Sequence, residues 1–335
     1  MTIYGRTLAA ACVLALCGCE PKQPGPGPAT RTAEPARRPA PGLLAAVGRS
    51  ARAEPAAAAT EAAGQAMAHL RAAGVRPAGA IFLDRAADTS PKRVTAIGRC
   101  VRRLTGAATC GHGTTPTGRE PAVTVLVLGG EGIDVRGFAT SGALAGGDPN
   151  DTAAARALRR ARAERGDALG RQISAAADGG IVLTFGALDA DAHASFQTAL
   201  HKRLRGGAAL AGGVGTRSDA VYLPGRPTSV GQLAVVIRGP VRLAVEPVAL
   251  SNRWDAGATR AEARAAMAAA VRRIAPSRPS LLLTFGRDEH NALLADRAGD
   301  VPIFAVSCTG QAGTDASGKL HAGTGRLIVA ALAAQ

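Results

Sequence analysis

The chain has 335 residues and a formal net charge of +15, and 47% of its residues are hydrophobic but only 3% are aromatic. This length is enough for one large domain or two joined lobes that bury roughly 75% of their unfolded surface. The positive charge suits nucleic acid, yet the basic residues are spread along the chain, few rings are present for base stacking, and no nucleic-acid module accompanies them. We therefore expect no nucleic-acid partner.

The amino terminus carries the pattern of an export signal. Arg6 precedes an apolar segment from Leu8 to Leu16 that is too short to span a bilayer. The next residues, Leu16-Cys17-Gly18-Cys19, resemble a bacterial lipobox, which makes Cys19 the lipid-modified first residue of the mature chain. We expect residues 1–19 to be a lipoprotein signal peptide. The protein is then exported and anchored in a membrane through Cys19, in the periplasm or at the outer membrane.

Residues 20–54 are predicted to be a tether. Pro, Gly, Ala and Arg dominate most of this stretch. Such a composition cannot bury a core and favours an extended spacer. A lipidated cysteine followed by a spacer would hold a folded domain away from a membrane surface.

Helical and strand patterns alternate through the rest of the chain. Strands of four to seven apolar residues separate the helices, which is typical of an α/β fold. Between residues 214 and 248 two strand-like segments flank a turn at Arg238-Gly239-Pro240, so we expect mixed sheets. The predicted helices span residues 55–71, 94–104, 151–176 with a break near Gly166, 189–206 and 261–274.

One plan occurs three times along the chain. An apolar strand is followed by a helix, a tight turn of small residues with Gly, and a second apolar strand. Leu183-Thr184-Phe185-Gly186 is nearly identical to Leu283-Thr284-Phe285-Gly286, which suggests related units. We expect two related lobes of repeated strand-helix-strand units, over residues 55–250 and 251–335.

The three glycine segments are the candidate ligand site. Glycine permits positive φ angles and removes the Cβ, so successive N–H groups of a turn can face an anion. Ligands in open α/β sheets usually lie at strand ends. The alternative is that these are tight turns without a ligand. We expect neither a cofactor nor a metal ion. The candidate ligand-binding residues are Cys110, Gly111, His112, Gly113, Gly212, Gly213, Gly215, Cys308, Thr309, Gly310 and Gln311.

From residue 66 to residue 332 the chain resembles the FIST sensory domain. The amino-terminal resemblance consists of a strand, a helix, the glycine pair, Asp219 and a strand that ends in Val235-Val236-Ile237-Arg238-Gly239. The carboxy-terminal one includes Cys308-Thr309-Gly310-Gln311 before the final strand. The resemblance implies a ligand-binding sensory module rather than an enzyme, with an unknown signalling partner. Gln311 stands where the family often has an acidic residue, so the ligand class stays open between an amino acid and an organic anion.

The cysteines leave further alternatives. In an oxidising compartment Cys110 could pair with Cys100 or with Cys308. A free Cys308 with His321 or His112 nearby could instead be a nucleophile, which would make the protein an envelope thiol hydrolase or transferase. A third interpretation is a scaffold that binds the cell envelope through its basic surface.

Overall fold

The structure is a computed structural model, and Pro39–Gln335 form one compact unit. The signal peptide, Cys19 and residues 20–41 of the predicted tether lie outside the described residues. Within the described part, no helix is both long enough and apolar enough to cross a membrane. The structure describes residues 42–86, 89–114, 122–141, 152–186, 190–204, 207–215, 219–250, 256–287, 291, 294 and 300–335.

The described residues form a mixed α/β fold made of three units with one topology. In each unit the last strand pairs antiparallel with the first and second strands, and the second and third strands are parallel. The first unit has the strand order β1-β4-β2-β3. Its elements are β1 (Leu44–Ser50), α1 (Pro55–Ala72), β2 (Pro77–Arg85), α2 (Pro91–Thr105), β3 (Ala108–Thr114) and β4 (Ala122–Gly129).

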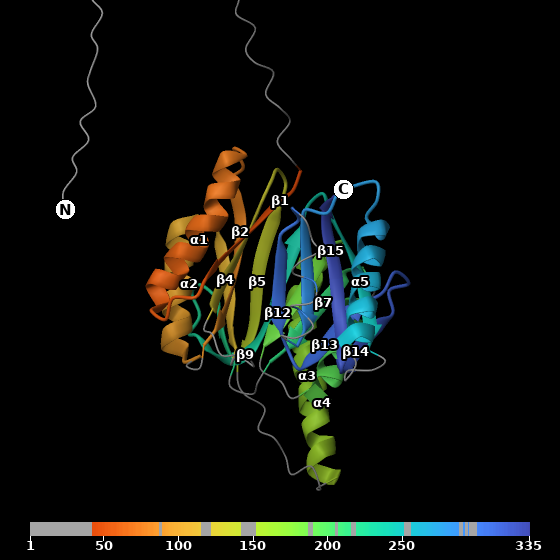
Figure 1. The fold of residues 1–335 in the computed structure, drawn as a ribbon. Helices are drawn as coiled ribbons and strands as arrows, with labels where there is room; N and C mark the ends of the chain where they lie inside the picture. Colours follow the sequence, from red (N-terminus) through yellow and green to blue (C-terminus); the bar gives the residue numbers. More distant parts are fainter. Residues whose placement is uncertain are drawn as a thin grey trace, which may run out of the picture. The chain divides into compact units, whose positions relative to one another are not determined.

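The other two units repeat this order as β5-β9-β6-β7 and β10-β15-β11-β12. Figure 1 shows α1 and α2 at one side of the molecule and α5 at the other. The second unit contains β5 (Asp134–Ser141), α3 (Thr152–Ala177), β6 (Ile181–Gly186), α4 (Ala190–Leu204), β7 (Ala209–Val214), β8 (Ala220–Tyr222) and β9 (Ser229–Arg238). The third contains β10 (Val241–Ala249), α5 (Ala256–Arg273), β11 (Leu281–Gly286), β12 (Ile303–Ser307), β13 (Gly310–Thr314), β14 (Leu320–Thr324) and β15 (Arg326–Ala334).

The three units meet at three seams. At the first seam β8 pairs with both β3 and β9, and at the second seam β13 pairs with β7. At the third seam the guanidinium of Arg49 donates to the backbone oxygen of Ile303 at 3.0 Å, and the hydroxyl of Ser280 donates to the backbone oxygen of Leu43. The third unit therefore returns to the first, and the units close into a ring.

Strand alternation divides the apolar side chains between a central core and three outer cores. Successive side chains of a strand point to opposite faces, so Ile81 and Leu83 enter the core shared by all three units, whereas Phe82 faces the helices of its own unit. The described strands of the three units belong to two mixed sheets, of 11 and 4 strands. Three separate outer cores lie between the sheets and their helices. The helices are rich in Ala, which allows close packing with few aromatic rings.

The predicted helices are confirmed. They could be predicted because the signals that begin and end them are local in sequence. Ser90 caps α2 by accepting from the N–H of Arg93, and Gly106 ends it with a φ of 65°. The predicted break near Gly166 is wrong, since α3 is continuous over 26 residues. A Cβ at Gly166 would collide with the backbone oxygen of Phe196, so this glycine serves the close approach of α3 and α4.

The predicted mixed sheets are confirmed, but the tether needs a correction. β1 lies inside residues 20–54 and pairs with β4 along its whole length, so the tether cannot extend to residue 54. The run Leu43-Leu44-Ala45-Ala46-Val47 is short, and its partner strand is about eighty residues away, so no local pattern marks it. The two-lobe division remains a prediction. Its boundary at residue 250 falls between β10 and α5, inside the third unit.

Candidate functional site

The first two glycine segments are strands, which corrects the prediction of tight turns. Residues 108–113 lie in β3, and residues 211–214 lie in β7. Their glycines have no φ in the left-handed region. Their N–H groups therefore do not form the predicted anion nest. Glycine is required here for close packing, since a Cβ at Gly111 would overlap the ring of Phe82.

The third glycine segment does contain a short turn-like link between two strands. β12 ends at Ser307, and Cys308 and Thr309 lead directly into β13. The N–H of Cys308 donates to the oxygen of Gly286 at 2.8 Å, and the N–H of Thr309 donates to the oxygen of Val214 at 2.8 Å. The first bond holds the connection to β11 of its own unit, and the second holds it to β7 of the preceding unit.

The second and third segments lie side by side. β13 pairs antiparallel with β7, and Gly213 is opposite Gln311. A Cβ at Gly213 would lie 2.8 Å from Cβ of Cys308 and closer still to its Sγ. Gln311 donates through Nε2 to the oxygen of Cys308 at 3.0 Å and accepts from the N–H of Arg326. These contacts bring three of the predicted residues, Gly213, Cys308 and Gln311, into one place.

The first segment reaches the same place through a buried polar cluster of His112, Thr114, Gly215, Asp219 and Thr309. His112 Nε2 is 3.0 Å from Asp219 Oδ2, and these side chains are 1% and 0% exposed. A Cβ at Gly215 would collide with Asp219 Oδ2 and with Thr114 Oγ1, so both oxygens lie against its backbone. Thr309 Oγ1 donates to the oxygen of Gly215 at 3.1 Å. The polar cluster therefore joins the carboxyl ends of β3 and β7 to the residue after Cys308.

The pairing with Asp219 fixes which nitrogen of His112 carries the proton. An ionised carboxylate only accepts hydrogen bonds, so Nε2 must donate and the neutral ring keeps its lone pair on Nδ1. That Nδ1 is buried and has no hydrogen-bond partner among the described residues. Buried polar atoms without partners are rare in native proteins. The ring is thus oriented to accept one more hydrogen bond.

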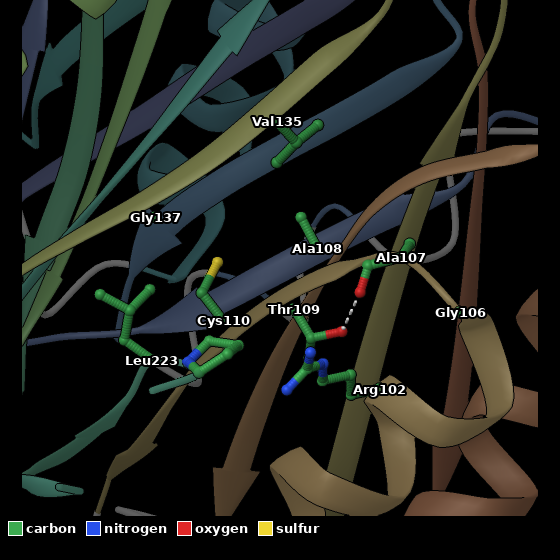
Figure 2. Close-up of a pocket in the computed structure, with 10 residues that line it drawn as sticks. Arg102, Gly106, Ala107, Ala108, Thr109, Cys110, Val135, Gly137 and Leu223 are labelled. Atoms are coloured by element: carbon green, nitrogen blue, oxygen red, sulfur yellow. Dashed lines mark hydrogen bonds between the residues drawn. The ribbon is translucent and has the colours of Figure 1, made fainter. Parts of the chain in front are cut away.

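The remaining predicted residues lie around the polar cluster without joining it. Cys110 lines a separate cavity of about 300 Å³ near the start of β3 (Figure 2). Gly113 lies against Val94 of α2, and Gly212 lies against Thr184 of β6. Gly310 lies against the ring of His193, a fully buried side chain of α4 whose two nitrogens have no partner in the described part of the chain.

Sequence reasoning missed a set of buried polar residues near the carboxyl ends of the strands. Asp84 and Thr184 occupy matching positions of β2 and β6, directly after Leu83 and Leu183. Each accepts from the helix that follows its strand. Arg93 donates to both carboxylate oxygens of Asp84, at 2.8 and 3.0 Å, and Gln197 donates to Thr184 Oγ1 at 2.8 Å. The alignment of the repeats could have located these positions.

The three described cysteines, Cys100, Cys110 and Cys308, are buried and form no disulfide, so neither proposed pairing is present. Burial raises the pKa of the Cys110 thiol to about 12. Cys308 is 4% exposed. His321, suggested as an activating base, contacts Asp315 Oδ2 at 2.7 Å in the hairpin of β13 and β14. This environment is typical of a packed cysteine rather than of a nucleophile, which requires access and a lowered pKa.

Comparisons with known proteins give no family. No family model matches the chain, and no curated protein matches it. Among solved structures, cyanuric acid hydrolase from A. caulinodans has a TM-score of 0.47 and 14% identity, over 88% of this chain and 99% of that one. T. maritima PurL complexed with AMPPCP has a TM-score of 0.31 and 12% identity, over 88% and 74%. Thiamine monophosphate kinase from Aquifex aeolicus has a TM-score of 0.22 and 13% identity, over 57% and 83%. Function must therefore be argued from this chain's own residues.

Proposed function

We propose that this protein is a small-molecule-binding sensory module, similar to FIST domains, whose ligand contacts the polar cluster at the carboxyl ends of β3 and β7. The observation that carries the proposal is the imidazole of His112, which is buried and oriented by Asp219 but has no partner at Nδ1 among the residues that the structure describes. Three segments far apart in sequence meet in the polar cluster that contains this ring. A purely structural histidine would be expected to use both of its nitrogens.

The chemistry of Nδ1 indicates the ligand class. A lone pair on a neutral imidazole accepts a hydrogen bond, so the ligand presents an N–H or O–H group. Asp219 lies behind the ring and stabilises the positive charge that the ring acquires if the ligand transfers a proton to it. An amino group or a hydroxyl meets this requirement. Binding needs no cofactor and no bond-breaking step.

The test is a thermal-shift screen of the protein against amino acids, sugars, small alcohols and organic acids. A ligand at one hundred times its dissociation constant stabilises the folded state by about 2.7 kcal/mol. Asp219→Asn is the informative variant, because its amide can donate to Nε2, which places the ring proton on Nδ1 and converts the acceptor into a donor. The matched control is Asp315→Asn, which alters a second Asp–His contact at a half-exposed hairpin.

The expected result is a ligand whose stabilisation disappears in Asp219→Asn and persists in Asp315→Asn. A ligand whose effect is the same in both variants binds elsewhere and contradicts the proposed site. If no compound in the screen stabilises the protein, the sensory function itself is refuted for these ligand classes.

We also propose that Cys19 anchors the module to a membrane of the envelope, with the residues up to about 41 as the spacer. The lipobox resemblance supports this, and the described unit begins beyond it. Incorporation of radiolabelled palmitate by the wild type and by Cys17→Ser, but not by Cys19→Ser, is the expected result. Equal labelling of both variants would argue against lipidation at this site.

A further inference from the structure

Two cavities occupy equivalent places at the first and second seams. The first cavity, of about 300 Å³, is lined by residues from Gly106 to Cys110, and the second, of about 460 Å³, is lined by residues from Gly207 to Ala209. Cys110 pairs with Ile81 of β2, and Ala209 pairs with Ile181 of β6. Cys110 and Ala209 therefore occupy equivalent positions in the third strands of the first and second units. The cavities are therefore built into the repeat and are not incidental surface irregularities.

The opposite walls also correspond. Gly137 of β5 and Leu183 of β6 pair with the same residue of β9, one from each side. In the same way, Val245 of β10 and Leu283 of β11 pair with the same residue of β15, so Gly137 and Val245 occupy equivalent positions. Both residues line their cavities. Each cavity thus lies between the start of one unit's third strand and the first strand of the next unit.

The first cavity combines an apolar interior with an open strand edge. β8 pairs with β3 only from Gly111 to Gly113, so the preceding stretch, Ala108–Cys110, runs along the cavity beyond this pairing. Val135, Leu223 and Pro224 supply the apolar walls. Thr109 turns its hydroxyl onto the oxygen of Ala107 at 3.0 Å, as Figure 2 shows.

The two cavities differ in charge. Arg102, near the end of α2, lines the first cavity, and none of the residues that line this cavity is acidic. Burial raises the pKa of the Tyr222 phenol, and Arg102, through its charge and a side-chain hydrogen bond, and Arg99 partly offset this rise. In the second cavity Arg273 already contacts Glu246 at 2.8 Å and the oxygen of Val245 at 2.9 Å, and Asp315 adds a carboxylate. Only the first cavity has a guanidinium without an opposing carboxylate among its lining residues.

We propose that the first cavity binds a small carboxylate with an apolar body. Its volume corresponds to about ten water molecules, and 300 Å³ is the lower end of the usual range for ligand pockets. The guanidinium of Arg102 pairs with the carboxylate, and Val135 and Leu223 contact the apolar body. This site is separate from the polar cluster, and the inference does not depend on the proposed sensory function.

The experiment titrates the full-length protein with benzoate and with benzamide, a neutral molecule of nearly the same shape. Methyl NMR signals of Val135 and Leu223 report where binding occurs. We expect benzoate to bind about tenfold more tightly than benzamide, a modest preference because Arg102 is largely exposed to solvent. The preference should fall as salt is added.

Arg102→Gln and Arg103→Gln form the matched pair of variants. Both side chains are exposed and lie in the last turn of α2, so both substitutions remove the same charge from the same helix end. Arg103 instead extends towards Cys100 and does not line the cavity. Arg102→Gln should bring the benzoate affinity down to that of benzamide, and Arg103→Gln should retain the preference.

A third variant, Ala108→Leu, fills the cavity from an exposed position without changing the charge. It should weaken both ligands. Equal benzoate affinity in the two arginine variants overturns the proposal. So does a titration that shifts methyl signals elsewhere but not those of Val135 and Leu223, and so does the absence of saturable benzoate binding up to about ten millimolar, the weak end of specific affinities.

Discussion

Replacing Gly213 by Ala tests whether the glycines of β7 serve packing rather than a turn. In a glycine turn an added methyl group would alter a ligand site and leave the fold intact. In the structure Gly213 is an extended strand residue whose missing Cβ faces the side chain of Cys308. The substitution should therefore act on the stability of the whole unit.

The size of the effect follows from the contact geometry. The new Cβ would lie 2.8 Å from Cβ of Cys308 and 3.3 Å from the oxygen of Gly310. Carbon atoms in contact prefer about 3.5–4.0 Å, so the two strands must separate or shift. Extra methyl groups in a packed core typically cost about 1–3 kcal/mol. At about 2–4 °C per kcal/mol, the melting temperature should fall by roughly 2–12 °C.

A compensating substitution separates this explanation from other effects at Gly213. Cys308→Gly removes the Cβ and Sγ atoms of Cys308, the two atoms nearest to the new methyl group. Alone, it loses a buried side chain and adds backbone freedom. The double variant exchanges which side of the contact carries the glycine, so the new methyl group has room. Its loss of stability should therefore be smaller than the sum of the losses in the two single variants. We expect a coupling free energy of about 1–2 kcal/mol in the double-mutant cycle.

Urea unfolding followed by circular dichroism measures all four proteins of the cycle. Additive effects would refute the direct contact between Gly213 and Cys308. A Gly213→Ala protein as stable as the wild type would restore the turn interpretation. The slope of the unfolding free energy against urea should stay constant across the cycle, because a changed slope indicates a different unfolded or native state.

Three other substitutions have defined outcomes. Arg93→Met removes two hydrogen bonds from the buried carboxylate of Asp84 and should lower the free energy of unfolding by about 3 kcal/mol in urea titrations, whereas an unchanged value would make that pair energetically neutral. Gly64→Ala places a methyl group in open space on an exposed face of α1 and should raise the free energy of unfolding by about 0.5–1 kcal/mol; a loss in the same assay would contradict the described helix. Burial lowers the pKa of His193 from 6.5 to about 3, so between these values the unfolded chain binds a proton that the folded chain does not. Stability should therefore fall by up to about 1.4 kcal/mol per pH unit as the pH drops below 6.5, and a wild type with the same pH slope as His193→Leu would refute this.

The helices and most strands could be predicted because their signals are local. Gly106 ends α2 where the apolar spacing stops, and the repeated Leu-Thr-Phe-Gly sequences that end at Gly186 and Gly286 mark β6 and β11. β1 gave no such signal. Its place depends on β4, far along the chain, and Leu44–Ser50 alone is too short and too rich in small residues to be separated from the preceding spacer.

The glycines show why composition alone could not settle the site. Glycine in a turn and glycine in a closely packed strand look the same in a sequence. What distinguishes them is the residue opposite, such as Phe82 for Gly111 or Cys308 for Gly213, and that neighbour is set by the fold. The pairing of His112 with Asp219 likewise connects residues from different units across a seam. The repeat indicated equivalent positions but not which of them would meet.

The strand order of the units has a consequence for how the chain folds. In each unit the central strand that joins the first strand to the second is the last one of its unit along the chain, namely β4, β9 and β15. Until that strand is available, the first strand has no partner in its own sheet, and pairing must wait for contacts distant in sequence, which is a slow step. The final strand, Arg326–Ala334, completes both the four-stranded sheet and the core shared by all three units. A chain that ends before this segment would expose the inner apolar faces of every sheet, and it should aggregate rather than remain as a smaller folded protein.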